Sequence, residues 1–196
     1  MNIATSIDQL IGNTPLMRLT RLEQRLGLHG QLLAKLEYFN PGGSIKDRAA
    51  LQMLRAAEQA GRIGPGALII EPTSGNTGIG RYLRERKPDV QLIAVEPASS
   101  PLLSQGHAGP HKIQGIGANF VPAVLDRSLL SRVQTVENDA AFAMMHLLAE
   151  TEGVFCGISS GAAVSAAADV LREDAMRGKT VVAILPDTGE RYLSCL

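Results

Sequence analysis

The chain has 196 residues, a formal net charge of +0 and 45% hydrophobic residues. This composition supplies apolar material for one sizeable core and allows one or two domains. Because positive and negative side chains balance and no basic stripe is present, the sequence argues against binding to nucleic acid or to an anionic membrane surface. The four histidines have no metal-ligand spacing to one another or to a cysteine or carboxylate motif, so we expect no metal site.

Cysteine usage and the apolar runs bear on the compartment. The two cysteines, Cys156 and Cys195, do not make a disulfide framework, and we expect a buried apolar residue and one near a chain end. No apolar run follows a basic start, and no apolar stretch approaches the length that crosses a bilayer. These features predict a soluble protein in the reducing cytoplasm.

Short apolar runs alternate with helical patterns along the chain. In chain order we expect a strand over Leu32–Glu37, a helix over Ile45–Ala60, a strand over Ala67–Ile70, a helix over Gly78–Lys87, a strand over Val90–Val95, a helix over Asn138–Glu150, a helix over Gly161–Arg177 and a strand over Thr180–Leu185. Asn138 is the expected N-cap of its helix. Strands that alternate with helices predict an α/β fold with a largely parallel sheet.

The stretch from Pro97 to Pro122 differs from the rest of the chain because it is rich in Gly, Pro, Ser and His. Loops of this length are usually functional or disordered. We interpret it as a long ordered loop over a site, not as a linker.

The first segment that indicates chemistry is Asn40–Arg48, in which a Pro-Gly-Gly turn leads into a helix. Lys46 then falls in the first helical turn, where the amide dipoles create positive potential. That potential disfavours an ammonium and favours the neutral amine, which is the form that attacks an aldehyde. A solvated lysine in an ordinary turn is the alternative that the local sequence leaves open.

The second segment, Thr73–Gly78, follows an expected strand and opens an expected helix. Its hydroxyls, its carboxamide and the free N–H groups of a helix N-terminus make an anion site that suits a carboxylate. A capped strand-to-helix turn is the alternative. Two further polar segments, Gly157–Gly161 and Pro186–Tyr192, also follow apolar runs, and polar loops at the carboxyl ends of strands are where open α/β sheets bind ligands.

Together these segments resemble cysteine synthase (O-acetylserine sulfhydrylase), a family of fold-type II pyridoxal-phosphate (PLP) enzymes. The resemblance runs nearly end to end. The segments that carry it are Ile11–Leu16, Pro41–Arg48, Pro72–Gly78, Val95–Pro97, Lys112–Gly117, Gly157–Gly161 and Gly189–Ser194.

The resemblance implies a role for each matching residue. Lys46 is implied to be the lysine that forms the Schiff base with PLP and moves protons during elimination. Asn76 is implied to contact the 3′-oxygen of PLP, and Ser159 to place a neutral hydroxyl at the pyridine nitrogen, which favours β-elimination over competing carbanion reactions. The residues implied to bind substrate are Thr73, Ser74, Gly75, Thr77 and Gly115, the last in a loop that flanks the active site.

The family reaction is β-replacement, in which O-acetylserine loses acetate and sulfide adds to give cysteine. The resemblance also implies a homodimer. In this family the active-site cleft can receive the C-terminal tail of serine acetyltransferase, whose terminal carboxylate occupies the substrate-carboxylate site. The implied partners are therefore a small amino-acid substrate, a second copy of the chain and that tail.

The chain departs from the family between Gly80 and Arg81. In the family, a long central block separates the first Thr-Gly-x-Gly from a second one, and that block ends in a Gly-Thr-Gly-Gly-Thr phosphate loop. Here the two are joined, so we expect residues 1–196 to form a single compact α/β domain, a remnant of the larger cofactor domain with most of the smaller mobile domain absent. Loss of the phosphate loop is expected to weaken PLP binding by several kcal/mol, because charged hydrogen bonds contribute roughly 1.5–3 kcal/mol each.

Two other functions stay open at the level of sequence. The chain could be a non-catalytic protein that binds a carboxylate or the acetyltransferase tail through Thr73–Thr77. It could also be an inactive truncated remnant that keeps only the core of the larger domain.

Overall fold

The computed structural model describes residues 3–59, 89–122 and 125–195. Its strands and helices, in chain order, are β1 (Leu16–Arg18), α1 (Thr20–Leu26), β2 (Gln31–Leu36), α2 (Lys46–Gln59), β3 (Ile93–Pro97), α4 (Leu102–Gln105), β4 (Arg132–Val136), α5 (Asn138–Glu152), α6 (Ile158–Leu171) and β5 (Thr180–Leu185). Short 3-10 helices lie at Ile7–Leu10, Glu37–Phe39, Arg127–Leu129, Asp174–Met176 and Gly189–Cys195.

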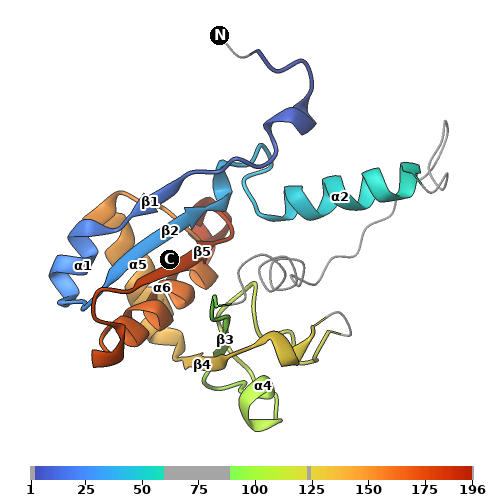
Figure 1. Ribbon diagram of the computed structural model, residues 1–196. Coiled ribbons are helices and arrows are strands. Elements are labelled where there is room, and N and C mark those ends of the chain that lie inside the picture. The colour runs from blue at the N-terminus through green and yellow to red at the C-terminus, as the bar shows by residue number, and fades with distance from the viewer. Residues whose placement is uncertain (1–2, 60–88, 123–124, 196) are drawn as a thin grey trace.

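The described strands form two sheets (Figure 1). In the first, β2 lies between β1 and β5; it pairs antiparallel with β1 and parallel with β5, with Leu36 opposite Leu185. In the second, β3 and β4 pair in parallel. Leu32, Ala34 and Leu36 are buried while the residues between them are less so, which is the period-two pattern of a strand with one face on the core. The predicted α/β fold with mostly parallel strands is confirmed.

Helix α6 forms the centre of the core. It packs against β5, β2 and α5, and most of its small residues are buried. Gly161 allows the closest approach of the two helices, because a Cβ at this position would collide with the Ala141 carbonyl and lie 3.0 Å from the Met145 backbone nitrogen. The small residues of α6 therefore let this helix pack closely against both α5 and the sheet.

The predicted elements agree best where the sequence pattern is strongest. The strand Thr180–Leu185 is found as predicted, and the helix expected from Ile45 begins one residue later. The expected strand at 67–70 and the expected helix at 78–87 lie outside the described residues. Sequence analysis missed β1, α1 and β4.

Several boundaries were predicted wrongly. The strand expected over Val90–Val95 is β3, at Ile93–Pro97. Helix α6 begins at Ile158 after the N-cap Gly157 and ends at Leu171, well before Arg177. Glu173 is extended and a separate 3-10 helix over Asp174–Met176 follows, while the Leu171 carbonyl accepts the His29 N–H at 3.0 Å. Asn138 is not an N-cap either: the N-cap is Glu137, and the Asn138 carboxamide accepts the Lys112 N–H at 2.8 Å.

The stretch from Pro97 to Pro122 is an ordered loop, as predicted, with the short helix α4 inside it. The Ser100 hydroxyl accepts the Gly109 N–H at 3.1 Å and donates to the Asn119 side chain at 3.0 Å. Ile113 anchors the second half of the loop in the core, where it is fully buried. The two hydrogen bonds thus join parts of the loop to one another, and Ile113, two residues before Gly115, ties the loop to the core.

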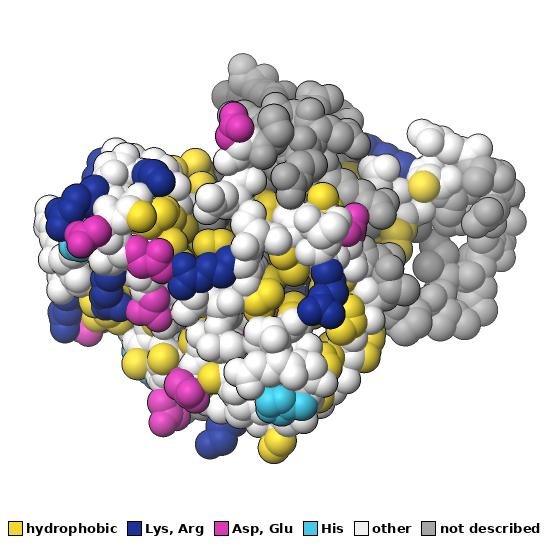
Figure 2. Space-filling view, turned by 60° about the horizontal axis from the view of Figure 1, so that its bottom comes forward, with side chains coloured by type: hydrophobic (Ala, Val, Ile, Leu, Met, Phe, Trp, Pro, Cys, Tyr) yellow, Lys and Arg dark blue, Asp and Glu magenta, His cyan; other side chains and the backbone are white. Residues whose placement is uncertain are grey.

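Charged side chains of both signs lie beside one another on the face shown in Figure 2, with apolar side chains between them. This arrangement agrees with the balanced charge of the chain. Of the helices in the described part of the chain, none is both long enough and apolar enough to span a membrane.

Candidate active site

Lys46 lies in the first turn of α2, as predicted, and is the first residue of that helix; its side chain is exposed. The turn before it is held by short polar contacts: the Gly42 N–H donates to Asp47 Oδ2 at 2.5 Å, and the Lys46 N–H donates to Ser44 Oγ at 3.3 Å. Gly43 has a φ of +69°, a left-handed conformation that favours glycine. The Pro-Gly-Gly sequence thus fixes the direction in which the chain enters α2.

A buried polar network supports this turn from the side of the sheet. Arg48, one helical half-turn from Lys46, donates to both oxygens of Glu37, at 2.8 and 3.1 Å. Thr14 donates to Glu37 Oε1 at 2.9 Å, and the Asn40 carboxamide donates to Oε2 at 2.9 Å. Glu37 is 3% exposed, so its carboxylate is compensated by these donors and not by water.

The pKa of Glu37 shows which effect prevails in this network. Burial by itself raises the pKa of the carboxyl, but the hydrogen bonds from Arg48, Thr14 and Asn40 outweigh burial and hold the pKa below its ordinary value. Glu37 is therefore a carboxylate at neutral pH and an anchor for Arg48. Sequence analysis missed Glu37, although an acidic residue directly after an apolar strand is an available signal.

The loop after β5 joins the Lys46 turn to the start of α6. The Ile45 N–H donates to the Pro186 carbonyl at 2.8 Å, and Ser44 forms an antiparallel bridge with Asp187. On the other side, the Gly157 N–H donates to the Asp187 carbonyl at 3.2 Å. Two neighbouring carbonyls therefore hold the two segments that the sequence singled out.

Ser159 and Gly115 meet beside this junction. Ser159 lies in the first turn of α6 and is 6% exposed. Gly115 has a φ of +97°, and a Cβ there would lie 3.2 Å from Ser159 Oγ, so the long loop passes directly over this hydroxyl. Within residues 3–59, 89–122 and 125–195, the hydroxyl has no hydrogen-bond partner and is available to a bound group.

The other predicted site residues cannot be placed in the same way. Thr73, Ser74, Gly75, Asn76 and Thr77 lie outside the described residues, so the predicted carboxylate loop and the partner of the PLP 3′-oxygen stay predictions.

Cys156 is buried beside the same junction but is not a nucleophile. Burial raises the pKa of its thiol to about 12, and the nearby Asp187 carboxylate acts in the same direction. A thiol with this pKa stays protonated at neutral pH, and the thiolate is the reactive form. Cys156 is thus the buried apolar cysteine that the sequence predicted. In the described part of the chain, no three His, Cys, Asp or Glu side chains are grouped as a metal site.

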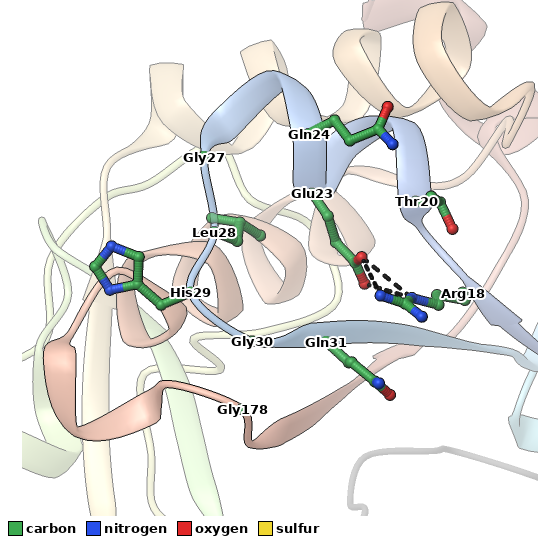
Figure 3. Close-up of a pocket in the computed structure, with 10 residues that line it drawn as sticks. All are labelled: Arg18, Thr20, Glu23, Gln24, Gly27, Leu28, His29, Gly30, Gln31 and Gly178. Atoms are coloured by element: carbon green, nitrogen blue, oxygen red, sulfur yellow. Dashed lines mark hydrogen bonds and ion pairs between the residues drawn. The ribbon is translucent and has the colours of Figure 1, made fainter.

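A separate hollow lies at the other end of the first sheet, where β2 begins (Figure 3). Its polar side chains bond to one another: Arg18 donates to the Glu23 carboxylate at 2.9 Å, and the same carboxylate accepts the Leu32 N–H at 2.7 Å. Because Glu23 is satisfied by these structural partners, the hollow offers no free charged group opposite a ligand. It lies away from Lys46, which is at the carboxyl end of β2.

Comparison with known proteins agrees with this geometry. The sequence matches the family described as pyridoxal-phosphate dependent enzymes over residues 7–80 and 77–187. The chain belongs to this family. A cysteine synthase from Staphylococcus aureus (strain Mu50) is 30% identical over an alignment of 298 residues that covers 96% of this chain and 95% of that protein.

Solved structures of the same kind are similar in fold. A cysteine synthase from Entamoeba histolytica is 26% identical with a TM-score of 0.91, and the match covers 98% of this chain and 90% of that one. A hydrogen sulfide-producing enzyme from Fusobacterium nucleatum is 29% identical with a TM-score of 0.90, covering 97% and 100%. An O-ureido-L-serine synthase is 29% identical with a TM-score of 0.89, covering 98% and 94%. The fold-type II architecture is thereby confirmed.

The family match comes in two stretches that overlap at residues 77–80, which is the Thr-Gly-Ile-Gly segment. The alignment with the Staphylococcus relative is also longer than the chain itself, so a large part of it has no residue of this chain opposite. The overlap of the two stretches falls at the segment after which the sequence suggested that a central block is absent.

Proposed function

We propose that this chain is a PLP-dependent β-replacement enzyme of the cysteine synthase type, which converts O-acetylserine and sulfide to cysteine and acetate. The observation that carries the proposal is the meeting of the Lys46 turn, the start of α6 and the Gly115 loop at one edge of the sheet. The relatives that are called cysteine synthases support the choice of reaction.

The described residues fit two of the contacts that PLP needs. Lys46 presents an exposed amine at a helix N-terminus, and that amine has no hydrogen-bond or ion-pair partner among the described residues. Ser159 presents a nearly buried hydroxyl beside Gly115, where any side chain would crowd that hydroxyl. We assign Lys46 to hold the aldehyde carbon of PLP and Ser159 to face its pyridine nitrogen, with Asn76 at the 3′-oxygen.

In the reaction, bound PLP supplies an electron sink for the electrons released at the α-carbon of the substrate. We assign Lys46 as the base that would take the α-proton of the substrate. Ser159 is neutral and leaves the ring nitrogen without a full positive charge, which favours loss of the β-substituent. We assign Thr73, Ser74, Gly75 and Thr77 to the substrate carboxylate and Gly115 to the wall of the substrate site.

We further propose that residues 1–196 are a single domain with an internal deletion between Gly80 and Arg81. The two overlapping stretches of the family match support this, and no Gly-Thr-Gly-Gly-Thr segment occurs in the chain. In the family this segment is a phosphate loop, and the free N–H groups of a loop at a helix N-terminus bind phosphate. Absence of the segment therefore predicts weak PLP binding. The protein is then an enzyme that needs a high PLP concentration.

The decisive experiment is an absorbance titration of the purified chain with PLP, followed by addition of O-acetylserine. We expect a visible band from lysine-linked PLP in the wild type and none in Lys46→Ala, and a spectral change with release of acetate when O-acetylserine is added. Lys35→Ala is the matched control, because Lys35 is a lysine of β2 that donates to the Thr14 carbonyl. A colourless wild type at saturating PLP would overturn the proposal.

The finer associations are proposals as well. We propose a homodimer, the C-terminal tail of serine acetyltransferase as a ligand of Thr73–Thr77, and a cytoplasmic setting, the last supported by the free buried thiol of Cys156. Calorimetry with a peptide that ends in isoleucine tests the tail. An absence of heat at high peptide concentration would count against it.

A further inference from the structure

The Pro186–Tyr192 loop is the segment whose residues the proposed chemistry leaves without a role, although it touches both halves of the site. Its backbone accepts the Ile45 N–H at the Pro186 carbonyl and the Gly157 N–H at the Asp187 carbonyl. It also forms bridges from Asp187 to Ser44 and from Thr188 to Cys156. Two consecutive residues of this loop, Pro186 and Asp187, therefore connect the turn that carries Lys46 to the helix that carries Ser159.

The Asp187 side chain is held in an unusual way. The Tyr192 hydroxyl donates to Asp187 Oδ2 at 2.7 Å, and Tyr192 itself is 6% exposed and belongs to the core. The other oxygen, Oδ1, is buried and has no hydrogen-bond partner in the described part of the chain. Leaving a buried acceptor unpaired costs free energy, so a chain that keeps one needs a reason for it.

The packing around Gly157 shows what this oxygen contacts in place of a hydrogen-bond donor. A Cβ on Gly157 would collide with Asp187 Oδ1 and lie 2.5 Å from Tyr192 Cε2, so the glycine is required by space. Its φ is −75°, which any residue adopts, so backbone freedom does not explain it. The Asp187 carboxylate is thus pressed against the N-cap of α6, two residues before Ser159, with Tyr192 behind it.

We propose that Asp187, fixed by Tyr192, is a positioning residue that sets the first turn of α6, and with it Ser159, relative to Lys46. The Tyr192 hydroxyl fixes the orientation of the Asp187 carboxylate, and this orientation in turn fixes the Asp187 backbone. The Pro186 and Asp187 carbonyls then hold the turn before α2 and the first turn of α6 at a fixed separation. This role rests on the proposed function for its meaning, because the two turns matter only if they share a cofactor. Its geometry stands independently of any cofactor.

The experiment uses Tyr192→Phe, Asp187→Ala, the double variant and the rescue variant Asp187→Asn, which keeps an oxygen for the Tyr192 hydroxyl. Glu190→Gln is the matched control, because Glu190 is an exposed acid of the same loop. The first readout is amide hydrogen exchange without added PLP at Ile45 and Gly157. We expect exchange at both to rise about tenfold or more in Tyr192→Phe and Asp187→Ala, the size expected for losing a hydrogen bond to a charged group.

In the double variant the effect should match that of either single variant, since the two residues act as one unit. Asp187→Asn should restore slow exchange, and Glu190→Gln should leave it unchanged. The second readout is the rate at which the PLP absorbance band forms, which should fall in the same variants and recover in Asp187→Asn.

Exchange that stays at the wild-type rate at either amide, that rises equally across β2 and β5, or that Asp187→Asn does not restore would overturn the positioning role. Asp187→Ala is the variant that could fail to fold, and Tyr192→Phe, which removes one hydroxyl, keeps the test decisive. A colourless wild type would overturn the proposed function, whereas the exchange rates judge the positioning role on their own.

Discussion

Helices α2 and α6 have the same length and each carries a residue of the candidate site in its first turn, but the protein supports them in opposite ways. In α6, 12 of the 14 residues are buried, including Ser159. In α2, which extends away from the sheet in Figure 1, no described side chain after Arg48 is buried and Met53 is 52% exposed. One half of the site is built on the hydrophobic core and the other half projects from it.

The difference shows which interactions hold the turn before α2, where the helix itself is not buried. The turn before α2 is held by the Glu37 carboxylate, its three side-chain donors and the Pro186 carbonyl, all of them polar contacts. Polar contacts of this kind fix geometry, but each adds little net stability unless a partner is left unpaired. We therefore expect the Lys46 side to respond sharply to loss of one partner, and the Ser159 side to respond to changes of volume.

The largest effect is expected from Arg48→Met, which leaves the Glu37 carboxylate buried without its charged partner. Glu37 is buried but the Arg48 side chain is 40% exposed, so we expect the free energy of unfolding to fall by about 3 kcal/mol, for the loss of two hydrogen bonds to a charged group at roughly 1.5 kcal/mol each. Urea unfolding followed by circular dichroism measures it. Loss of the PLP band at a concentration that saturates the wild type should accompany the change.

Arg55→Met is the matched control on the same helix. Arg55 pairs with Asp8 at 3.0 Å, but both side chains are largely exposed, and exposed pairs contribute about 0–1 kcal/mol. Similar losses in the two variants would contradict the view that Glu37 anchors the Lys46 turn by a buried contact.

A smaller effect is expected on the other side from Gly161→Ala. The new methyl group would press on the Ala141 carbonyl and the backbone of Met145, which cannot rotate away. Overpacking in a dense core costs about 1–3 kcal/mol, so the urea midpoint should fall while Arg48 and its network are untouched. Asp169→Ala, at an exposed position of the same helix, should change stability far less. Helix propensity favours alanine in both variants, so an equal loss in both would contradict overpacking at Gly161 as the cause.

Parts of this arrangement could be predicted from the sequence. The strand Thr180–Leu185 and the start of α2 follow from local patterns, namely an apolar run after a glycine and a Pro-Gly-Gly turn before an amphipathic stretch. Lys46 could be singled out because its position in a helical first turn is a local property. Cys156 could be expected to be buried because it follows an apolar run.

What could not be predicted depends on contacts between distant segments. The Glu37 network joins residues 14, 37, 40 and 48, and nothing local indicates that an acid after a strand will meet an arginine in the next helix. The Leu171 carbonyl, at the end of α6, accepts the N–H of His29, more than a hundred residues earlier. Likewise, the requirement for Gly157 arises from Asp187 and Tyr192 and not from its own backbone.

The smallest expected effect is the pH dependence that Glu37 contributes. Its pKa in the folded protein is held below the ordinary value by Arg48, Thr14 and Asn40. A carboxyl with a lowered folded pKa adds stability that is fully present above its unfolded pKa and is lost as the pH falls through the folded pKa. We expect this part, about 1 kcal/mol for the net effect of such hydrogen bonds, to disappear as the pH falls from the ordinary glutamate range into stronger acid.

Arg48→Met should reverse the sign of this contribution. Without the guanidinium, burial prevails and the folded pKa of Glu37 rises above its unfolded value. The carboxyl then takes up its proton more readily in the folded state, so its contribution to stability increases as the pH falls from the raised folded pKa to the unfolded pKa, just above the interval in which the wild type loses stability. Urea unfolding of wild type and variant at a series of pH values isolates Glu37, because the other carboxyls titrate in both proteins. The difference in unfolding free energy should narrow steadily with acid, and a constant difference would show that Arg48 supports the turn by packing alone.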